Sequence, residues 1–155
     1  MKVRDAVRGL VLNSKERVLL MQMQLPGRPK IWLAPGGGVE GGESKHEAIR
    51  RELKEELGPI AIEIGAPIWF GEADVPLFSD ELIRLRETYF LCRTEAEAFS
   101  RAGWTELERQ TVLDLRWWSI EDIRDSDEII YPTSIAAELP PVLAGEIGPA
   151  REIVL

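Results

Sequence analysis

The pattern of apolar and polar residues predicts several β-strands around one long helix. Residues 3–12 and 17–24 are β-rich segments separated by the turn-like stretch 13–16, which together predict a hairpin. Residues 31–34 predict a third, shorter strand, and the glycine-rich stretch after them predicts a loop. A long helix is therefore expected only after three strands.

The long helix is predicted from Ser44 to Leu57. Ser44 followed three residues later by Glu47 is typical of a capping box, which marks where a helix starts. At about 100° per residue, Ile49, Leu53 and Leu57 fall on one apolar stripe. This stripe is expected to pack the helix onto the sheet.

Further strands are predicted after the helix. Residues 61–71, 84–93 and 113–118 have the β-rich composition of strands, and residues 74–80 are expected to form a proline-bearing loop. The strands thus lie on both sides of the helix in the chain.

Two short helices are predicted near the end of the chain. Ser119 can cap one that runs through Arg124, and Thr133 or Ser134 can start another that ends before Pro140. Strands on both sides of a central helix, followed by helices, predict an α/β fold with a mixed sheet covered on both faces.

Length and composition narrow the class of protein. A chain of 155 residues suits a single domain, residues 1–155, with a sizeable core. The formal net charge is −8 and no basic run stands out, so long nucleic acid is not expected as a partner. The sequence does not decide the oligomeric state, and a homodimer is compatible with it.

The compartment is predicted from cysteine content and hydropathy. The single cysteine, Cys92, excludes an internal disulfide and fits a reducing cytoplasm. The first residues lack a secretory apolar region, and no apolar run approaches the ~18 residues that span a membrane. A cytoplasmic protein without a membrane partner is expected.

Three carboxylates carry the candidate chemistry. Glu52, Glu55 and Glu56 fall in a sector about 100° wide beside the apolar stripe, so packing should direct them outward. Like charges at this spacing cost a few tenths of a kcal/mol per pair, and stability alone does not explain them. A divalent cation would relieve the repulsion, since Mg²⁺ takes hard oxygen ligands together with substrate phosphates.

A glycine-rich loop precedes these carboxylates. The stretch from Pro35 to Glu43 contains five glycines in nine residues. Such a backbone can approach a ligand closely and present N–H groups to phosphate or a carbonyl oxygen to a metal.

The loop and the helix contain one motif of fixed spacing. Its residues are Gly37, Glu43, Arg51, Glu52, Leu53, Glu55, Glu56 and Gly58. This spacing resembles the Nudix box. The chain departs from that pattern at Pro59, where the box has an aliphatic residue. Because proline commonly follows a helix end, this departure concerns local packing.

The resemblance implies an α/β/α sandwich and an enzyme. Its implied reaction is the hydrolysis of a diphosphate linkage in a nucleoside diphosphate derivative, dependent on Mg²⁺ or Mn²⁺. In that reaction Arg51 would orient a box glutamate, and Glu43 would be a secondary ligand or a brace. The implied metal ligands are Glu52, Glu55, Glu56 and the carbonyl of Gly37.

The general base stays open among three carboxylates. Glu55 lies in the box, whereas Glu108 could act from a loop, although Thr105 with Glu108 is also typical of a capping box. Glu87 lies on a largely apolar strand face, where it is either the partner of an arginine such as Arg51 or a metal ligand.

The alternative function is a non-catalytic, nucleotide-binding regulatory module on the same fold. The intact set of box glutamates argues against it. The number of metals and the substrate also stay open. ADP-ribose, nucleotide sugars, oxidised nucleoside triphosphates, dinucleoside polyphosphates and coenzyme A all contain the required linkage.

Overall fold

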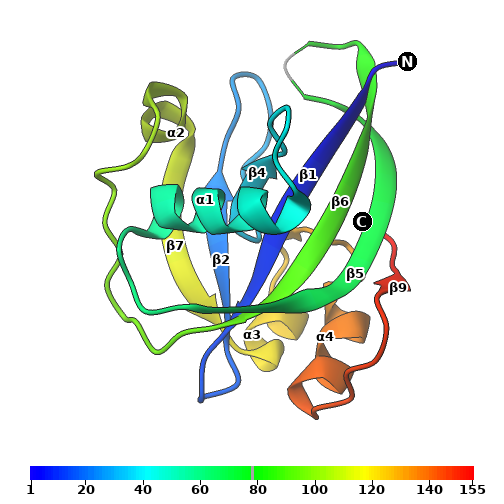
Figure 1. Cartoon of the computed structure of the whole chain (residues 1–155). Helices are drawn as coiled ribbons and strands as arrows, with labels where there is room; N and C mark the ends of the chain where they lie inside the picture. Colours follow the sequence, from blue (N-terminus) through cyan, green and yellow to red (C-terminus); the bar gives the residue numbers. More distant parts are fainter. Residues whose placement is uncertain (78) are drawn as a thin grey trace.

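A long parallel pairing between two strands forms the centre of the sheet (Figure 1). The computed structural model describes residues 1–77 and 79–155. In it, β1 (Val3–Leu12) runs beside β6 (Leu82–Arg93), in register from the pair Val3 and Arg84 to the pair Leu12 and Arg93. Two segments about 80 residues apart in sequence therefore build the middle of the fold.

The remaining strands extend this pair on both sides. The order across the sheet is β8-β3-β2-β1-β6-β5-β9, with β4 paired to β1 and β7 paired to β2. Parallel and antiparallel pairs both occur, so the predicted mixed sheet is confirmed. The other strands are β2 (Val18–Met23), β3 (Ile31–Leu33), β4 (Gly36–Gly38), β5 (Glu63–Pro76), β7 (Val112–Trp118), β8 (Ile129–Ile130) and β9 (Arg151–Glu152).

Helices cover both faces of the sheet (Figure 1), as the sandwich prediction required. The helix α1 (Lys45–Leu57) packs on one face, and α3 (Ile120–Asp125) and α4 (Ile135–Leu143) pack on the other. Side chains of β1 alternate between the two cores: Val7 meets the α1 side, and Leu10 meets the side of α3 and α4.

The start and packing of α1 agree with its sequence pattern, although only the Ser44 half of the predicted capping box is formed. The Ser44 hydroxyl accepts a hydrogen bond from the Glu47 N–H at 3.1 Å and caps the helix. Ile49, Leu53 and Leu57 are all at most 1% exposed. At the other end Gly58 adopts φ 86°, a left-handed conformation that ends the helix before Pro59.

The predicted hairpin is wrong in its extent. β1 and β2 are the expected strands, but their pairing is restricted to Leu12 with Val18 beside the turn. The middle of β1 pairs instead with β4, where Ala6, Val7 and Arg8 face Gly38, Gly37 and Gly36. Because the strands diverge, β2 pairs mainly with β7 and β3.

The predicted loop at residues 74–80 begins too early. β5 continues through Pro76, and Asp74 pairs with Arg84 across the strands through an ion pair of 3.0 Å. The pairing of β5 with β6 thus continues past residue 74, where the loop was predicted to begin. Position 78 of the predicted loop lies outside the described residues.

The predicted end of α4 is also wrong. The helix continues through Pro140 and Pro141 to Leu143, although proline cannot supply a helical N–H. Leu139 and Val142 are buried at 0% and 5% exposure, so their core packing outweighs the lost hydrogen bonds. None of the helices in the described parts of the chain combines the length and hydropathy of a membrane-spanning segment.

Replacing Leu53 by alanine is expected to lower the free energy of unfolding by about 2–5 kcal/mol, because it leaves a cavity between α1 and the sheet. The exposed neighbour provides a matched control, and Lys54→Ala should change the same quantity by less than about 0.5 kcal/mol. Urea unfolding followed by circular dichroism measures both. Equal losses in the two variants would contradict the packing of α1.

Candidate active site

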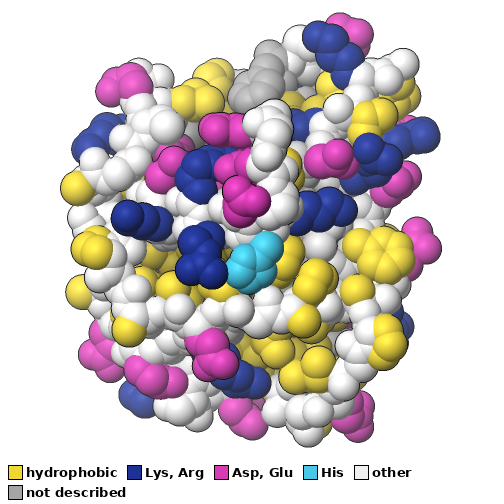
Figure 2. All heavy atoms as spheres, in the orientation of Figure 1, with side chains coloured by type: hydrophobic (Ala, Val, Ile, Leu, Met, Phe, Trp, Pro, Cys, Tyr) yellow, Lys and Arg dark blue, Asp and Glu magenta, His cyan; other side chains and the backbone are white. Residues whose placement is uncertain are grey.

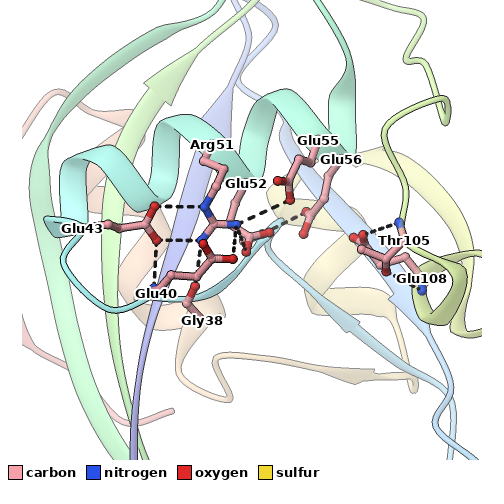
Figure 3. Close-up of polar contacts among 10 residues, drawn as sticks. Gly38, Glu40, Glu43, Arg51, Glu52, Glu55, Glu56, Thr105 and Glu108 are labelled. Atoms are coloured by element: carbon pink, nitrogen blue, oxygen red, sulfur yellow. Dashed lines mark hydrogen bonds and ion pairs between the residues drawn. The ribbon is translucent and has the colours of Figure 1, made fainter.

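The guanidinium of Arg51 joins the acidic helix to the loop that precedes it (Figure 3). Its Nε and Nη2 donate to the two carboxylate oxygens of Glu43 at 2.9 and 2.7 Å. Nη2 also donates to the carbonyl of Gly38 at 3.0 Å. This bidentate, charge-assisted pair fixes both the distance and the orientation of the loop relative to α1.

The same guanidinium contacts the carboxylates of the box. Nη1 of Arg51 donates to Glu52 Oε1 at 2.9 Å and lies 3.5 Å from Glu55 Oε2 and 3.7 Å from Glu40 Oε1. One cation thus lies among four carboxylates from the loop and the helix. It reduces the repulsion that their spacing would otherwise cause.

These contacts shift the ionisation of both partners. The hydrogen bonds from Arg51, and then the N–H of Glu40, lower the pKa of Glu43 to about 2. The hydrogen bond to Glu43 raises the pKa of Arg51 above its ordinary value, with Glu52 adding to the effect. Glu43 therefore stays ionised over the whole physiological range of pH.

The three box glutamates lie at different depths. The side chains of Glu52 and Glu55 are 13% and 38% exposed, whereas Glu56 is only 3% exposed. The expectation that packing directs all three outward is thus wrong for Glu56. That residue lies over the glycine loop, and its Oε2 accepts a hydrogen bond from the N–H of Gly36 at 3.0 Å.

Burial and mutual repulsion act on two of these carboxyls. Burial, and then the charge of Glu52, raises the pKa of Glu56 well above its ordinary value, while Arg8 acts in the opposite direction. Burial followed by the charge of Glu52 also raises the pKa of Glu55. The negative charge of this face is only partly neutralised by the protein's own cations.

The first glycines of the predicted loop, Gly36–Gly38, instead form β4, and an added side chain would clash at two of these positions. Gly36 has φ 149°, and a Cβ there would lie 2.0 Å from the carbonyl oxygen of Val7. A Cβ on Gly37 would lie 2.6 Å from Oε1 of Glu52. The loop backbone therefore lies directly between β1 and the Glu52 carboxylate, which brings Gly37 and Glu52 together.

The donor atoms fit a hard divalent cation in their chemistry. Glu52, Glu55 and Glu56 supply carboxylate oxygens on one face, the ligand type that Mg²⁺ and Mn²⁺ prefer. In the part of the chain that the structure describes, no three His, Cys, Asp or Glu side chains already form a metal-binding group.

A hollow of about 640 Å³ opens beside Glu52. It lies between the start of β1 and the glycine loop, and Figure 2 shows acidic and basic side chains interleaved on this face. A polar ligand can therefore reach Glu52 from this side. The residues that line the hollow are Val3, Arg4, Asp5, Gly38, Val39, Glu40, Gly41 and Glu52.

Glu108 lies on a short helix and not on the loop that the catalytic hypothesis expected, and the capping box predicted with Thr105 is present. It forms a capping box at the start of α2 (Glu106–Thr111), accepting from the Thr105 N–H at 2.9 Å and donating its own N–H to the Thr105 hydroxyl at 3.1 Å. Its charge is also among the causes, after burial and Glu52, that raise the pKa of Glu55 and Glu56. The capping carboxylate thus lies near the box glutamates (Figure 3).

Glu87 is the partner of an arginine other than Arg51. Arg8 Nε donates to Glu87 Oε2 at 2.6 Å, and the Tyr89 hydroxyl donates to Oε1 at 3.3 Å. Glu87 is 7% exposed, and Arg8 also donates to the carbonyl of Ala34 at 3.2 Å. Both Glu87 oxygens are therefore engaged in a buried network below the glycine loop.

Sequence reasoning did not find three contributors to this site: the N–H of Gly36, the carbonyl of Gly38 and the indole of Trp104, which bonds the Glu56 carbonyl at 2.8 Å. The two glycine groups are backbone atoms, so the glycine-rich composition of the loop is their only sequence signal. Trp104 lies 48 positions from Glu56, and no local pattern connects the two.

Comparison with known proteins identifies the family. A family model for the NUDIX domain matches residues 2–137. The chain belongs to the Nudix family. This match confirms the resemblance inferred from the box.

Individual relatives of this Nudix chain differ in their sequence identity and in the share of each chain that aligns. An RNA pyrophosphohydrolase of Nitratiruptor is 54% identical over 72 residues, which cover 44% of this chain and less than half, 46%, of that protein. An RNA pyrophosphohydrolase of Ruthia magnifica is 29% identical over 152 residues, which cover 87% of this chain and 80% of that protein. A Nudix hydrolase structure from Nitrosomonas europaea has a TM-score of 0.69 at 20% identity, and the match covers 96% of this chain and 93% of that one. This likeness supports the fold.

The Arg51–Glu43 pair makes a prediction about pH. Because the pKa of Glu43 is lowered from 4.5 to about 2 on folding, the pair stabilises the protein above about pH 4.5 and loses this effect as pH falls toward 2. Glu43→Gln should therefore be less stable than the wild type at pH 6, and the difference should shrink between pH 4.5 and 2. Urea unfolding at several pH values measures it.

The exposed Glu97 lies outside the helices and strands and away from the Arg51 contacts, and Glu97→Gln is the control for this series. It should follow the wild type at every pH. A gap between the wild type and Glu43→Gln that stays constant down to pH 2 would show that ionisation of Glu43 is not its source.

Proposed function

We propose that this protein hydrolyses a diphosphate linkage in a nucleoside diphosphate derivative, with Mg²⁺ or Mn²⁺ as its cofactor. The observation that carries the proposal is the face formed by Glu52, Glu55 and Glu56, held beside the glycine loop by Arg51. Membership of the Nudix family, whose relatives include named pyrophosphohydrolases, supports the same reaction.

The residues that would hold the metal are the three box glutamates and the carbonyl of Gly37. A bound divalent ion would neutralise phosphate oxygens and lower the pKa of a water molecule. The close approach of Gly37 to the Glu52 carboxylate supports this set, because a side chain at Gly37 would displace that carboxylate.

Arg51 and Glu43 would act by positioning. Arg51 donates to Glu52 and so limits the rotamers of that carboxylate. Glu43 takes two donors of Arg51 with its two oxygens, an arrangement that supports the role of a brace over that of a metal ligand. Such supporting bonds typically change metal affinity or activity by about 10–100-fold when they are removed.

The general base is best sought in Glu55 or Glu108. Glu55 is the most exposed of the box glutamates, and burial raises the pKa of its carboxyl, which favours proton uptake. Glu108 lies near enough for its charge to act on Glu55. Glu87 is less suitable because Arg8 and Tyr89 already bind its oxygens.

The direct test is a substrate panel assayed with Mg²⁺, with Mn²⁺ and with excess EDTA. It should include ADP-ribose, a nucleotide sugar, a nucleoside triphosphate, a dinucleoside polyphosphate and coenzyme A, with products identified by mass. Cleavage at a diphosphate bond that stops with EDTA is expected. Thermal stabilisation by one compound without any cleavage would instead favour the non-catalytic regulatory module.

A substitution tests the metal face. Glu56→Gln should lower turnover by on the order of 100-fold, because the carboxamide keeps the size of the side chain but loses its charge. Glu47→Gln on the exposed face should keep wild-type turnover, and circular dichroism should show both variants folded. Near wild-type turnover in Glu56→Gln would remove the basis for this ligand set.

A further inference from the structure

The segment before α2 crosses the C-terminal end of the box helix. The indole Nε1 of Trp104 donates to the carbonyl of Glu56 at 2.8 Å, and the N–H of Ser100 donates to the carbonyl of Leu57 at 3.1 Å. The last carbonyls of a helix have no partner within the helix, so these bonds satisfy two of them. The segment is thereby attached to the backbone of a residue on the carboxylate face.

This attachment is close and buried. A Cβ on Gly103 would lie 2.8 Å from the carbonyl oxygen of Glu55, so only glycine allows the chain to pass at this distance. Trp104 is 6% exposed, and the guanidinium of Arg101 lies 4.8 Å from its ring centre. Arg109 of α2 donates to the carbonyl of Arg101 at 3.1 Å and ties the helix to the same segment.

Glu108 is connected to this attachment by the capping box. Thr105 follows Trp104 directly in the chain, and its N–H donates to Glu108 Oε1 at 2.9 Å. The Glu56 carbonyl is thus bonded to the Trp104 indole, and the next residue, Thr105, is bonded to the Glu108 carboxylate through its N–H. Two hydrogen bonds, joined by the Trp104 side chain and one peptide unit, link the carboxylate to the box helix. Each bond removes freedom that the carboxylate would otherwise have on a short, exposed helix.

We propose that Trp104 is a positioning residue, whose indole N–H holds Glu108 at the carboxylate face of the box helix. The inference rests on the proposed hydrolysis and adds a residue outside the box to it. Trp104 acts through Glu108 and touches no reacting group. A tryptophan is required because phenylalanine would fill similar space but could not donate to the Glu56 carbonyl.

A purely structural role for Trp104 makes a different prediction. Its ring packs with Met21 and Val112, and this burial alone would account for an aromatic residue here. Trp104→Phe retains most of that burial and removes the hydrogen bond. A structural role therefore predicts lower stability with unchanged coupling to Glu108, whereas positioning predicts that the two residues act together.

The first experiment is a double-mutant cycle of Trp104→Phe and Glu108→Gln, assayed for kcat and KM on a substrate that the wild type cleaves. Trp104→Phe should lower kcat by about tenfold with KM changed less than about twofold, and Glu108→Gln should lower kcat by about 100-fold. In the Glu108→Gln background, Trp104→Phe should have almost no further effect. Trp117→Phe, the same substitution at a partly buried tryptophan packed on Phe99, is the matched control and should keep wild-type kcat.

The second experiment does not depend on turnover. Hydrogen–deuterium exchange should become faster in residues 105–111 of Trp104→Phe and stay unchanged there in Trp117→Phe. If the wild type cleaves no compound, the proposed hydrolysis fails, and this exchange result alone decides whether Trp104 anchors α2.

Three results would overturn the role of Trp104. The first is wild-type kcat in Trp104→Phe or in Glu108→Gln. The second is a double variant in which the fold-loss of kcat equals the product of the two single losses. The third is unchanged exchange in residues 105–111 of Trp104→Phe.

Discussion

The arrangement of the site depends on one guanidinium among several carboxylates. Arg51 binds both oxygens of Glu43, the carbonyl of Gly38 and one oxygen of Glu52. Without this cation, acidic groups from the loop and the helix would repel one another at short range. The N–H groups of its planar guanidinium point in fixed directions. The hydrogen bonds therefore set the position of the loop as well as the strength of its attachment to α1.

The sheet holds the other side of the loop. β4 pairs with β1 through three glycines, and Gly36 approaches Val7 so closely that no side chain is accommodated. The N–H of Gly36 then meets the buried carboxylate of Glu56. The loop is therefore fixed between β1 and α1, and the same contacts that build the fold also place the Glu52 and Glu56 carboxylates.

Local patterns predicted those features that depend on residues close together in sequence. The start of α1 at Ser44 follows from capping, and the buried stripe through Leu53 follows from helical periodicity. The predictions that were wrong depended on distant contacts. β1 pairs with β6 along its whole length and with β4 at three positions. The helix α4 runs through Pro140 because Leu139 and Val142 pack in the core.

The sequence by itself determined the set of box residues, because their spacing is local and specific, and the resemblance that they carry implied the family and the sandwich fold. Only the tertiary structure decided that Glu56 is buried, that Glu87 binds Arg8 from 79 positions away, and that Trp104 contacts the Glu56 backbone. These contacts join segments far apart in the chain. Their energies depend on burial and on which side chains meet, and neither is encoded in the spacing of any one segment.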